Sequence, residues 1–113
     1  MAGFDPELYA RGLREANRRE QQQIEQRLQD ARTEAERLIT LLKNSANCSD
    51  ACLFGSVADG SARRLDFDID IAVWGGDILA AQEIADDSIF KVDIVQYEHA
   101  PEHLQHRIDE YRR

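Results

Sequence analysis

Residues 53–73 read LFGSVADGSARRLDFDIDIAV, a stretch in which two apolar runs flank a segment of small and charged residues. The first run, residues 51–54, ends at Gly55 and predicts a short buried strand. The second run, residues 68–73, alternates polar and apolar side chains and then becomes wholly apolar, which predicts a strand with one exposed end. The residues after Ser56 predict a single helical turn between these two strands.

Downstream of this stretch the pattern predicts one more strand and two helices. Residues 90–97, FKVDIVQY, predict a third strand in which odd-numbered residues share one face and even-numbered residues the other. Asp77 is expected to cap a short helix over residues 78–85, and Pro101 to open a final helix. The apolar residues of that last helix are spaced four and three apart: Leu104, Ile108 and Tyr111. The predicted fold class is therefore α/β (α+β), a small mixed sheet flanked by helices.

One long helix is predicted to precede the sheet. Asp5 is in position to cap it, Pro6 suits its first turn, and the residues up to Lys43 are mostly good helix formers. Such a helix is about 57 Å long at the usual rise per residue. Its second half carries an apolar seam at alternating steps of four and three: Ile24, Leu28, Ala31, Ala35, Leu38 and Leu42. Residues 17–23 are wholly polar, so the first half of the helix is expected to project.

The seam permits two interpretations. It packs either on the chain's own domain, which is the usual arrangement for an amphipathic helix, or on another chain. In the second case the helix serves in docking or in homo-oligomerisation. The chain is accordingly divided into a docking or oligomerising helix at residues 1–45 and a compact domain at residues 46–113.

The 113 residues are enough for one domain, and the net charge of −8 is unevenly placed along them. Residues 1–44 carry eight acidic and eight basic side chains, whereas residues 45–113 carry fourteen acidic and six basic ones. A non-specific nucleic-acid binder needs a basic face, so that class is excluded. No apolar run is long enough to cross a membrane and no export signal is evident. We therefore expect a cytoplasmic protein in which Cys48 and Cys52 are reduced.

Carboxylates gather where the second predicted strand begins. Asp66, Asp68 and Asp70 alternate with apolar residues, so all three are expected on one face. Asp93 is the one acidic residue of the third strand, where a central position would make it costly unless it is paired or coordinated. If the two strands are neighbours, Asp68, Asp70 and Asp93 converge on an oxygen site suited to Mg²⁺. The alternative is that Lys91 or an arginine simply pairs with them.

The Gly55-Ser56 pair lies directly between the first strand and the predicted helical turn. Backbone N–H groups at such a junction, together with a serine hydroxyl, are suited to binding phosphate. The pattern differs from the P-loop, which needs GxxxxGK followed by serine or threonine. A Gly-Ser pair alone is usually a turn, but a phosphate-binding turn followed by paired strand carboxylates and a later third carboxylate is a far more specific pattern.

Taken together, LFGSVADGSARR, DFDIDIAV and KVDIV resemble the nucleotidyltransferases of the polymerase-β superfamily in their minimal, single-domain form (MNT). The signature of that superfamily is a Gly-Ser pair after two apolar residues, a further glycine, and then Asp-x-Asp on a strand. The resemblance covers residues 53–95 and extends loosely to the end of the chain. It implies that residues 46–113 form a minimal nucleotidyltransferase domain with a polymerase-β-like fold.

Three features depart from that signature. Phe67 stands where a serine usually precedes the first aspartate, and Asp59 stands where many members have arginine. The loop before the strand is also one residue longer than is usual. An alternative metal pair, Asp66 with Asp68, would leave the following residues out of register, so Asp68 and Asp70 are preferred.

The resemblance implies a chemistry and a set of site residues. Two Mg²⁺ ions and ATP are the expected cofactor and substrate, and the reaction is transfer of a nucleoside monophosphate to a hydroxyl group. The implied catalytic residues and metal ligands are Asp68, Asp70 and Asp93. The implied nucleotide-binding residues are Gly55, Ser56, Arg63 and Arg64. The two arginines are equally well explained as ordinary surface residues, and Lys91 is a weaker candidate for phosphate contact.

The acceptor implied by the resemblance is a protein. Minimal members of the superfamily are antitoxin-like partners of small helical HEPN-type proteins, which implies a toxin–antitoxin pair in which the transferase adds AMP to its partner. The alternatives are a non-catalytic antitoxin-like binding module and a small-molecule (antibiotic-type) nucleotidyltransferase completed across a dimer. Separately, the three histidines are expected to be solvated surface residues rather than metal ligands: His99, His103 and His106.

Overall fold

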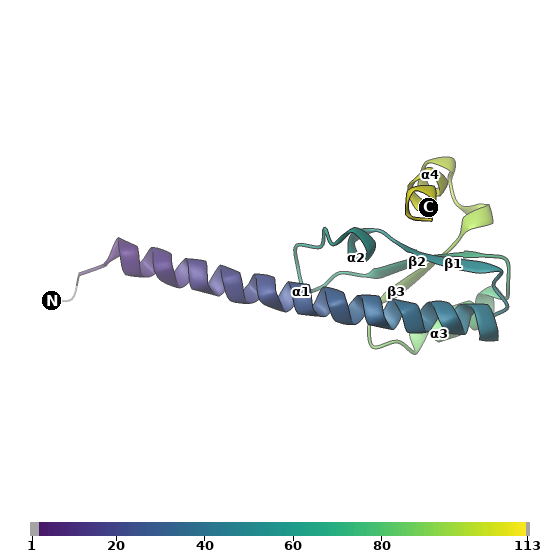
Figure 1. The fold of residues 1–113 in the computed structure, drawn as a ribbon, viewed down its shortest axis with the longest axis horizontal. Helices are drawn as coiled ribbons and strands as arrows, with labels where there is room; N and C mark the ends of the chain where they lie inside the picture. Colours follow the sequence, from purple (N-terminus) through teal and green to yellow (C-terminus); the bar gives the residue numbers. More distant parts are fainter. Residues whose placement is uncertain (1–2, 113) are drawn as a thin grey trace.

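The computed structural model describes residues 3–112, and its dominant element is one long helix, α1 (Pro6–Ser45). The carboxylate of Asp5 caps the first turn, accepting hydrogen bonds from the N–H groups of Glu7 and Leu8 at 3.0 and 3.4 Å. The predicted N-terminal helix is thus confirmed, and it continues two residues past the predicted end at Lys43. Because α1 extends well beyond the sheet, the molecule measures 69 × 29 × 19 Å along its principal axes (Figure 1).

Three strands form a mixed sheet in the order β1-β2-β3. β1 (Asp50–Phe54) pairs antiparallel with β2 (Ile69–Trp74), and β2 pairs parallel with β3 (Val92–Gln96). All three predicted strands are present, with ends that differ from the prediction by one or two residues. Every residue of the central strand except Asp70 is buried, because β2 is covered on both faces.

Short helices connect and follow the strands. α2 (Ser56–Asp59) follows β1 directly, α3 (Ile78–Asp86) leads from β2 to β3, and a 3₁₀ turn, η1 (Tyr97–His99), leads to α4 (Glu102–Tyr111). Asp77 caps α3 as predicted, since its carboxylate accepts hydrogen bonds from N–H groups of the first turn. The order of elements therefore matches the predicted one, with η1 added before the last helix.

One face of the sheet is covered by α1 and α3. The six seam residues predicted from their spacing are the six buried residues of α1, and they share one apolar cluster with Ile69, Ile71 and Val73 of the sheet. Leu38 and Leu42 are completely enclosed, at 1% and 0% exposure. The seam thus packs on the chain's own sheet, because strand alternation turns the odd-numbered residues of β2 toward it.

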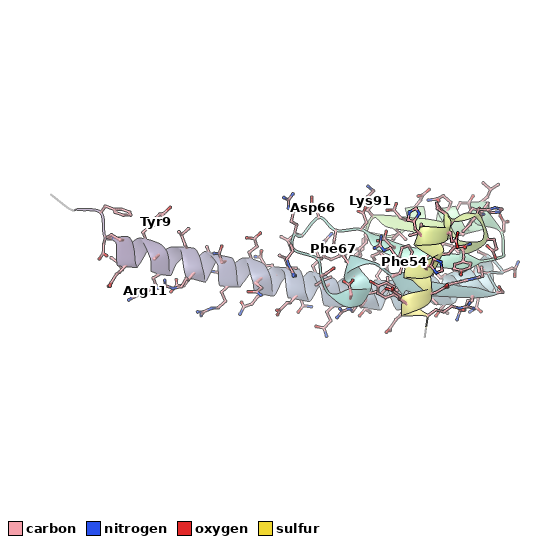
Figure 2. The ribbon with its side chains drawn as sticks, turned by 90° about the horizontal axis from the view of Figure 1, so that it is seen from above. Tyr9, Arg11, Phe54, Asp66, Phe67 and Lys91 are labelled. Atoms are coloured by element: carbon pink, nitrogen blue, oxygen red, sulfur yellow. The ribbon has the colours of Figure 1, made fainter. Side chains whose placement is uncertain are left out.

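The opposite face of the sheet is covered by α4. Ile108 is fully buried against Phe54, Ala72 and Trp74, and these four residues form a second, smaller apolar cluster, against which Tyr111 also packs. Figure 2, seen from above, shows α4 crossing over the sheet beside Phe54. Since the even-numbered residues of β2 point to this face, its polar side chains lie here rather than in the larger core.

The first half of α1 projects from the sheet, as predicted. None of its side chains up to residue 23 is buried, and burial begins at the first seam residue, Ile24. Large apolar side chains at 48–74% exposure lie on or just before this half: Phe4, Leu8, Tyr9 and Leu13. Even so, no helix within residues 3–112 is long and apolar enough to span a membrane.

The cysteines and histidines are not arranged as metal ligands. Cys48 is buried and Cys52 partly so, both are free, and burial raises the pKa of both thiols. The three histidines are exposed, which confirms that they are surface residues: His99, His103 and His106.

Candidate active site

Gly55 lies at the turn between β1 and α2 in a backbone conformation that only glycine adopts readily. Its φ of 81° and ψ of −156° fall in a region that is essentially closed to residues with a side chain. The space is closed as well, because a Cβ at this position would lie 2.6 Å from Oδ2 of Asp70. The Asp70 carboxylate, from the second aspartate of the predicted pair, therefore lies close to the Gly-Ser turn, in the space that a side chain at Gly55 would need.

This turn leaves backbone donors available. α2 begins at Ser56, and no side chain caps its first turn. The N–H groups of a first helical turn have no acceptor within the helix itself. At the other end, Gly60 adopts a left-handed conformation with φ of 73°, and its N–H donates to the carbonyl of Ser56. The segment is thus a single turn with a glycine on either side, whose first N–H groups can serve an acceptor such as phosphate.

Asp70 brings the three predicted carboxylates together. It pairs in register with Asp93 on the neighbouring parallel strand, and Asp68 lies two residues earlier with the same alternation. Burial, followed by the negative charges of Asp93 and Asp68, raises the pKa of Asp70 to about 6. The charges of the other two carboxylates therefore reach Asp70, and this repulsion favours a proton or a cation at Asp70.

Asp66, the alternative first ligand, lies elsewhere. It is exposed and lines a surface pocket together with Gln23 and Gln26 of α1. Figure 2 shows it in the loop that reaches along α1, away from Phe54. It also has no part in the pKa rise of Asp70. The aspartates that the structure groups are those at 68, 70 and 93.

Two expectations about these aspartates need correction. Asp93 was expected in a central strand, but β3 is an edge strand and Asp93 is exposed, so burial does not force it to find a partner. Asp68 was expected inside the second strand, but β2 begins one residue later, at Ile69. The strand order determines the exposure of Asp93, and the last ladder hydrogen bond determines where β2 begins. A local sequence pattern specifies neither.

Lys91 pairs with one of the three carboxylates. Its Nζ lies 3.6 Å from Oδ2 of Asp68, with the two side chains 76% and 35% exposed. The ion pair that stood as the alternative to a metal site is therefore present at Asp68, although an exposed pair of this kind contributes little stability. Asp70 and Asp93 form no ion pair with any residue in the 3–112 range.

These residues have the donor atoms that suit a metal ion, but their side chains are not arranged around one. Over residues 3–112, no three His, Cys, Asp or Glu side chains are arranged to hold an ion as they stand. The donor set is nevertheless all carboxylate oxygen, which is what Mg²⁺ prefers. One of the three, Asp70, already carries a raised pKa from burial and from the other two.

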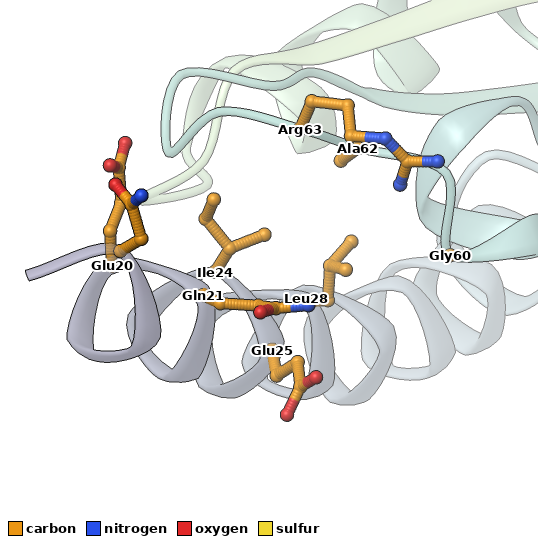
Figure 3. Close-up of a pocket in the computed structure, with 9 residues that line it drawn as sticks. Glu20, Gln21, Ile24, Glu25, Leu28, Gly60, Ala62 and Arg63 are labelled. Atoms are coloured by element: carbon orange, nitrogen blue, oxygen red, sulfur yellow. The ribbon is translucent and has the colours of Figure 1, made fainter. Parts of the chain in front are cut away.

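The two predicted phosphate-binding arginines lie away from this cluster. Arg63 and Arg64 are exposed in the segment between α2 and β2. Arg63 lines a pocket of about 340 Å³ between that segment and α1, and Figure 3 shows it across the pocket from Ile24 and Leu28. In the part of the chain that the structure describes, neither arginine is in an ion pair. The structure does not bring them to the carboxylates.

Asp59, one of the departures from the signature, ties α2 to α4. Its carboxylate accepts a hydrogen bond from the hydroxyl of Tyr111 at 2.8 Å and one from the N–H of Ser61 at 2.9 Å. These two bonds close the turn and hold the C-terminal helix over it. An aspartate at this position therefore joins two elements that both border the carboxylate cluster.

Phe67, the second departure, anchors the longer loop to α1. Its ring stacks on Phe90, with ring centroids 6.3 Å apart. The Arg27 guanidinium lies over both rings, 5.8 Å from that of Phe67 and 4.7 Å from that of Phe90. The same side chain donates from Nε to the carbonyl of Leu65 at 2.9 Å. The loop is thus held by the helix, so the strand after it begins at a fixed position.

Arg107 is a residue near the carboxylates that sequence reasoning did not identify. It lies on α4, and its positive charge opposes the rise in the pKa of Asp70 that burial causes. The same charge adds to the lowering of the pKa of Asp59, which comes mainly from the hydrogen bonds with Ser61 and Tyr111. No local sequence signal marks Arg107, because its place depends on how α4 packs across the sheet.

Comparison with known proteins identifies a family for most of this architecture. A protein-family model described as "Polymerase beta, Nucleotidyltransferase" matches residues 36–112, which is more than half of the chain. The matched segment begins inside α1 and includes the three strands, the Gly-Ser turn, the three carboxylates and α4. A search of curated proteins finds no match.

Proposed function

Because the chain belongs to the polymerase-β nucleotidyltransferase family, we propose that it transfers a nucleoside monophosphate, AMP from ATP, to a hydroxyl group. The observation that carries this proposal is the closeness of two parts of the signature, because the Asp70 carboxylate occupies the space beside Gly55 that a side chain there would need. A phosphate bound at the turn lies beside the carboxylates that would hold metal ions. Phosphoryl transfer depends on that combination of phosphate donors and metal ligands.

Asp68, Asp70 and Asp93 are the proposed ligands of two Mg²⁺ ions. When bound, the ions neutralise charge on the triphosphate and on the departing pyrophosphate. For this, Asp68 turns from Lys91 toward Asp70, which costs little because the pair is largely exposed. A cation also relieves the repulsion that, after burial, raises the pKa of Asp70.

The other roles fall to the chain's own groups. The first N–H groups of α2 and the hydroxyl of Ser56 hold the β- and γ-phosphates, and the lack of a side chain at Gly55 lets them approach. Asp93 is exposed on an edge strand, so an acceptor can reach it, and it takes the proton of the incoming hydroxyl. The acceptor oxygen bonds to the α-phosphorus while the bond to the β-phosphate oxygen breaks, and pyrophosphate leaves.

The proposed acceptor is a hydroxyl of a partner protein, a small helical HEPN-type protein in a toxin–antitoxin pair. The support for a protein partner is the projecting half of α1, at whose start the Phe4 and Tyr9 rings lie 5.4 Å apart and both are exposed. Contiguous exposed apolar side chains of this kind are typical of protein contact surfaces. The same segment would serve if the chain forms a homo-oligomer.

A second candidate function is a non-catalytic antitoxin-like binding module. The Lys91–Asp68 ion pair favours it, since Lys91 already neutralises this carboxylate and a metal ion would have to displace it. Under this alternative the projecting helix carries the function, and the carboxylates can be replaced without loss. A small-molecule (antibiotic-type) nucleotidyltransferase, with its acceptor site completed by a second copy, would instead turn over without any protein acceptor.

The test is transfer of α-labelled nucleotide in an extract of the source organism with Mg²⁺. Wild type is expected to label one protein band, and Asp68→Asn to lose the label, because it removes a proposed metal ligand. Asp66→Asn is the matched control, since this aspartate lies two residues away and outside the cluster. Equal labelling by wild type and Asp68→Asn would contradict the proposal. Full neutralisation of the partner by Asp68→Asn would establish the binding module instead.

A further inference from the structure

A triphosphate in this site needs a positive charge that the loop after the turn does not supply. The carboxylates around Asp70 make the site strongly acidic, and Asp59 at the end of α2 adds to the negative charge. Arg63 in the loop faces α1 across the pocket of Figure 3. Metal ions can offset part of the repulsion, but a polyphosphate is normally also held by a side-chain cation.

The C-terminal helix brings such a cation to the site. Ile108 is fully buried in the cluster that contains Phe54, and Phe54 is the register partner of Asp70 in the sheet. Arg107 immediately precedes Ile108 on α4, so its backbone is one helix position from a residue that packs against Phe54. Its helix position is therefore fixed by core packing next to the Gly-Ser turn.

A second contact fixes the direction in which this part of α4 faces. Tyr111 lies four residues after Arg107, and residues four apart share one side of a helix. The hydroxyl of Tyr111 donates to Asp59 of α2 at 2.8 Å. The side of α4 that carries Arg107 is consequently the side turned toward α2. In agreement, the Arg107 charge acts on Asp70 and on Asp59 alike.

The guanidinium of Arg107 is available, unlike that of the other well-placed arginine on this helix. Arg112 stacks on Trp74 at 4.2 Å and pairs with Asp50 at 2.8 Å, so it serves to hold α4 in place. Arg107 is exposed, and across residues 3–112 it takes part in no ion pair. A free guanidinium at the edge of an anion site is suited to the paired hydrogen bonds that phosphate oxygens accept.

We propose that Arg107 binds the polyphosphate of the nucleotide substrate, so that α4 is part of the nucleotide site. The inference rests on the proposed function, because it needs a triphosphate at the Gly-Ser turn. Under it, the Tyr111–Asp59 hydrogen bond positions Arg107 relative to the turn. It also assigns a role to a residue 51 positions after Ser56 in the chain, outside the motif that marks the family.

The experiment is calorimetric titration of the full-length protein with two probes, Mg²⁺-tripolyphosphate and Mg·ATP. Arg107→Gln is expected to weaken binding of both about tenfold or more, since it removes a charged donor pair. Arg107→Lys keeps the positive charge but not the paired N–H donors of the guanidinium, so it is expected to lose less affinity for both probes than Arg107→Gln. Arg14→Gln is the matched control, because it makes the same change on an exposed turn of α1 and is expected to bind as wild type does.

The outcomes separate this inference from the function on which it rests. Binding by wild type with unchanged affinity in Arg107→Gln would overturn the role of Arg107 and leave the proposed function standing. If Arg63→Gln lowers the affinity for the probes and Arg107→Gln does not, the loop arginine and not Arg107 binds the polyphosphate. If wild type binds neither probe, nor any other nucleoside triphosphate with Mg²⁺ or Mn²⁺, both proposals fail. Equal thermal unfolding of Arg107→Gln and wild type without ligand excludes a folding defect.

Discussion

The two faces of the sheet are built from alternate residues of the same strand, yet they have opposite properties. Ile69, Ile71 and Val73 enter the larger core beneath α1 and α3 at 0–1% exposure. Asp70 points to the other face, where burial and neighbouring carboxylates raise its pKa to about 6. Within residues 3–112 no polar or charged side chain is fully buried, so the larger core is apolar throughout. The α1 face is purely apolar, whereas the α4 face combines a smaller apolar cluster with the charged residues around Asp70.

This separation predicts that stability and activity respond to different substitutions. Changes on the α1 face are expected to lower stability without touching the chemistry. Changes on the α4 face are expected to alter ligand binding, and some should even stabilise the metal-free protein. Four substitutions, in order of decreasing effect on stability, test this separation.

Leu38→Ala on the α1 face is expected to have the largest effect. The side chain is 1% exposed in the seam, so the substitution leaves a cavity and lowers the free energy of unfolding by about 3 kcal/mol. Urea denaturation measures this loss. Leu8→Ala, on the exposed half of α1, is the control and is expected to change stability by less than about 0.5 kcal/mol. Similar losses in both variants would contradict the packing of the seam on the sheet.

Gly55→Ala tests the turn on the other face. A side chain there meets both a positive φ and the Asp70 carboxylate at 2.6 Å, so a loss of about 2 kcal/mol is expected together with loss of nucleotide binding. Gly12→Ala is a matched glycine substitution in an open part of α1, where alanine should add up to about 1 kcal/mol. Thermal unfolding compares the two, and tolerance of alanine at Gly55 would show that the turn is not as described.

Asp70→Asn is expected to separate stability from function most clearly. The folded-state pKa of Asp70 lies above its unfolded value, so folding takes up a proton between about pH 4 and pH 6. The wild-type free energy of unfolding therefore falls as the pH rises through that window. Because the carboxyl is only half-buried, the fall is about 1 kcal/mol after solvent screening. In Asp70→Asn this fall should disappear, and metal-dependent nucleotide binding should disappear with it.

Denaturation at a series of pH values without divalent ions measures this effect. Asp66→Asn serves as the control, since it removes a nearby charge outside the cluster. A pH profile of Asp70→Asn identical to that of wild type would mean that burial and the two neighbouring carboxylates do not raise the pKa of Asp70.

Tyr111→Phe is expected to have the smallest effect on stability. It removes one exposed hydrogen bond to Asp59, which is worth about 0.5 kcal/mol. Ile108 keeps α4 on the sheet, so the helix should remain in place while Arg107 becomes less well positioned. A few-fold loss of Mg²⁺-tripolyphosphate affinity, measured by calorimetry, is the expected signature. No change in affinity would show that the hydrogen bond does not position Arg107.

The buried faces of the helices and strands could largely be predicted from the sequence, because they follow from the periodic spacing of apolar residues. The spacing of four and three in α1 identified all six buried residues of the helix, from Ile24 to Leu42. Alternation predicted that Phe90 and Val92 lie on the opposite face from Val95, and in the structure the first two join the α1 cluster and Val95 packs against the α4 cluster. Each of these features follows from the geometry of one element, so a local pattern is sufficient.

The features that could not be predicted depend on how elements meet. The sequence does not say that β3 lies at an edge, so the exposure of Asp93 was missed. The Lys91–Asp68 pair and the place of Arg107 depend on side-chain direction and on the crossing of α4 over the sheet. Arg63 and Arg64 were associated with the site because they lie near it in the sequence. The path of their loop also depends on how elements meet, and Arg63 instead lines a pocket against α1.

The central claim is that Asp68, Asp70 and Asp93 form one metal-dependent nucleotide site with the Gly-Ser turn. Titration of Mn²⁺ into the protein with a non-hydrolysable ATP analogue, followed by electron paramagnetic resonance, tests it directly. Wild type and Asp66→Asn are expected to bind two ions per chain, and Asp70→Asn to bind none at the same concentrations. Retention of both ions by Asp70→Asn, or their loss in Asp66→Asn alone, would contradict the claim.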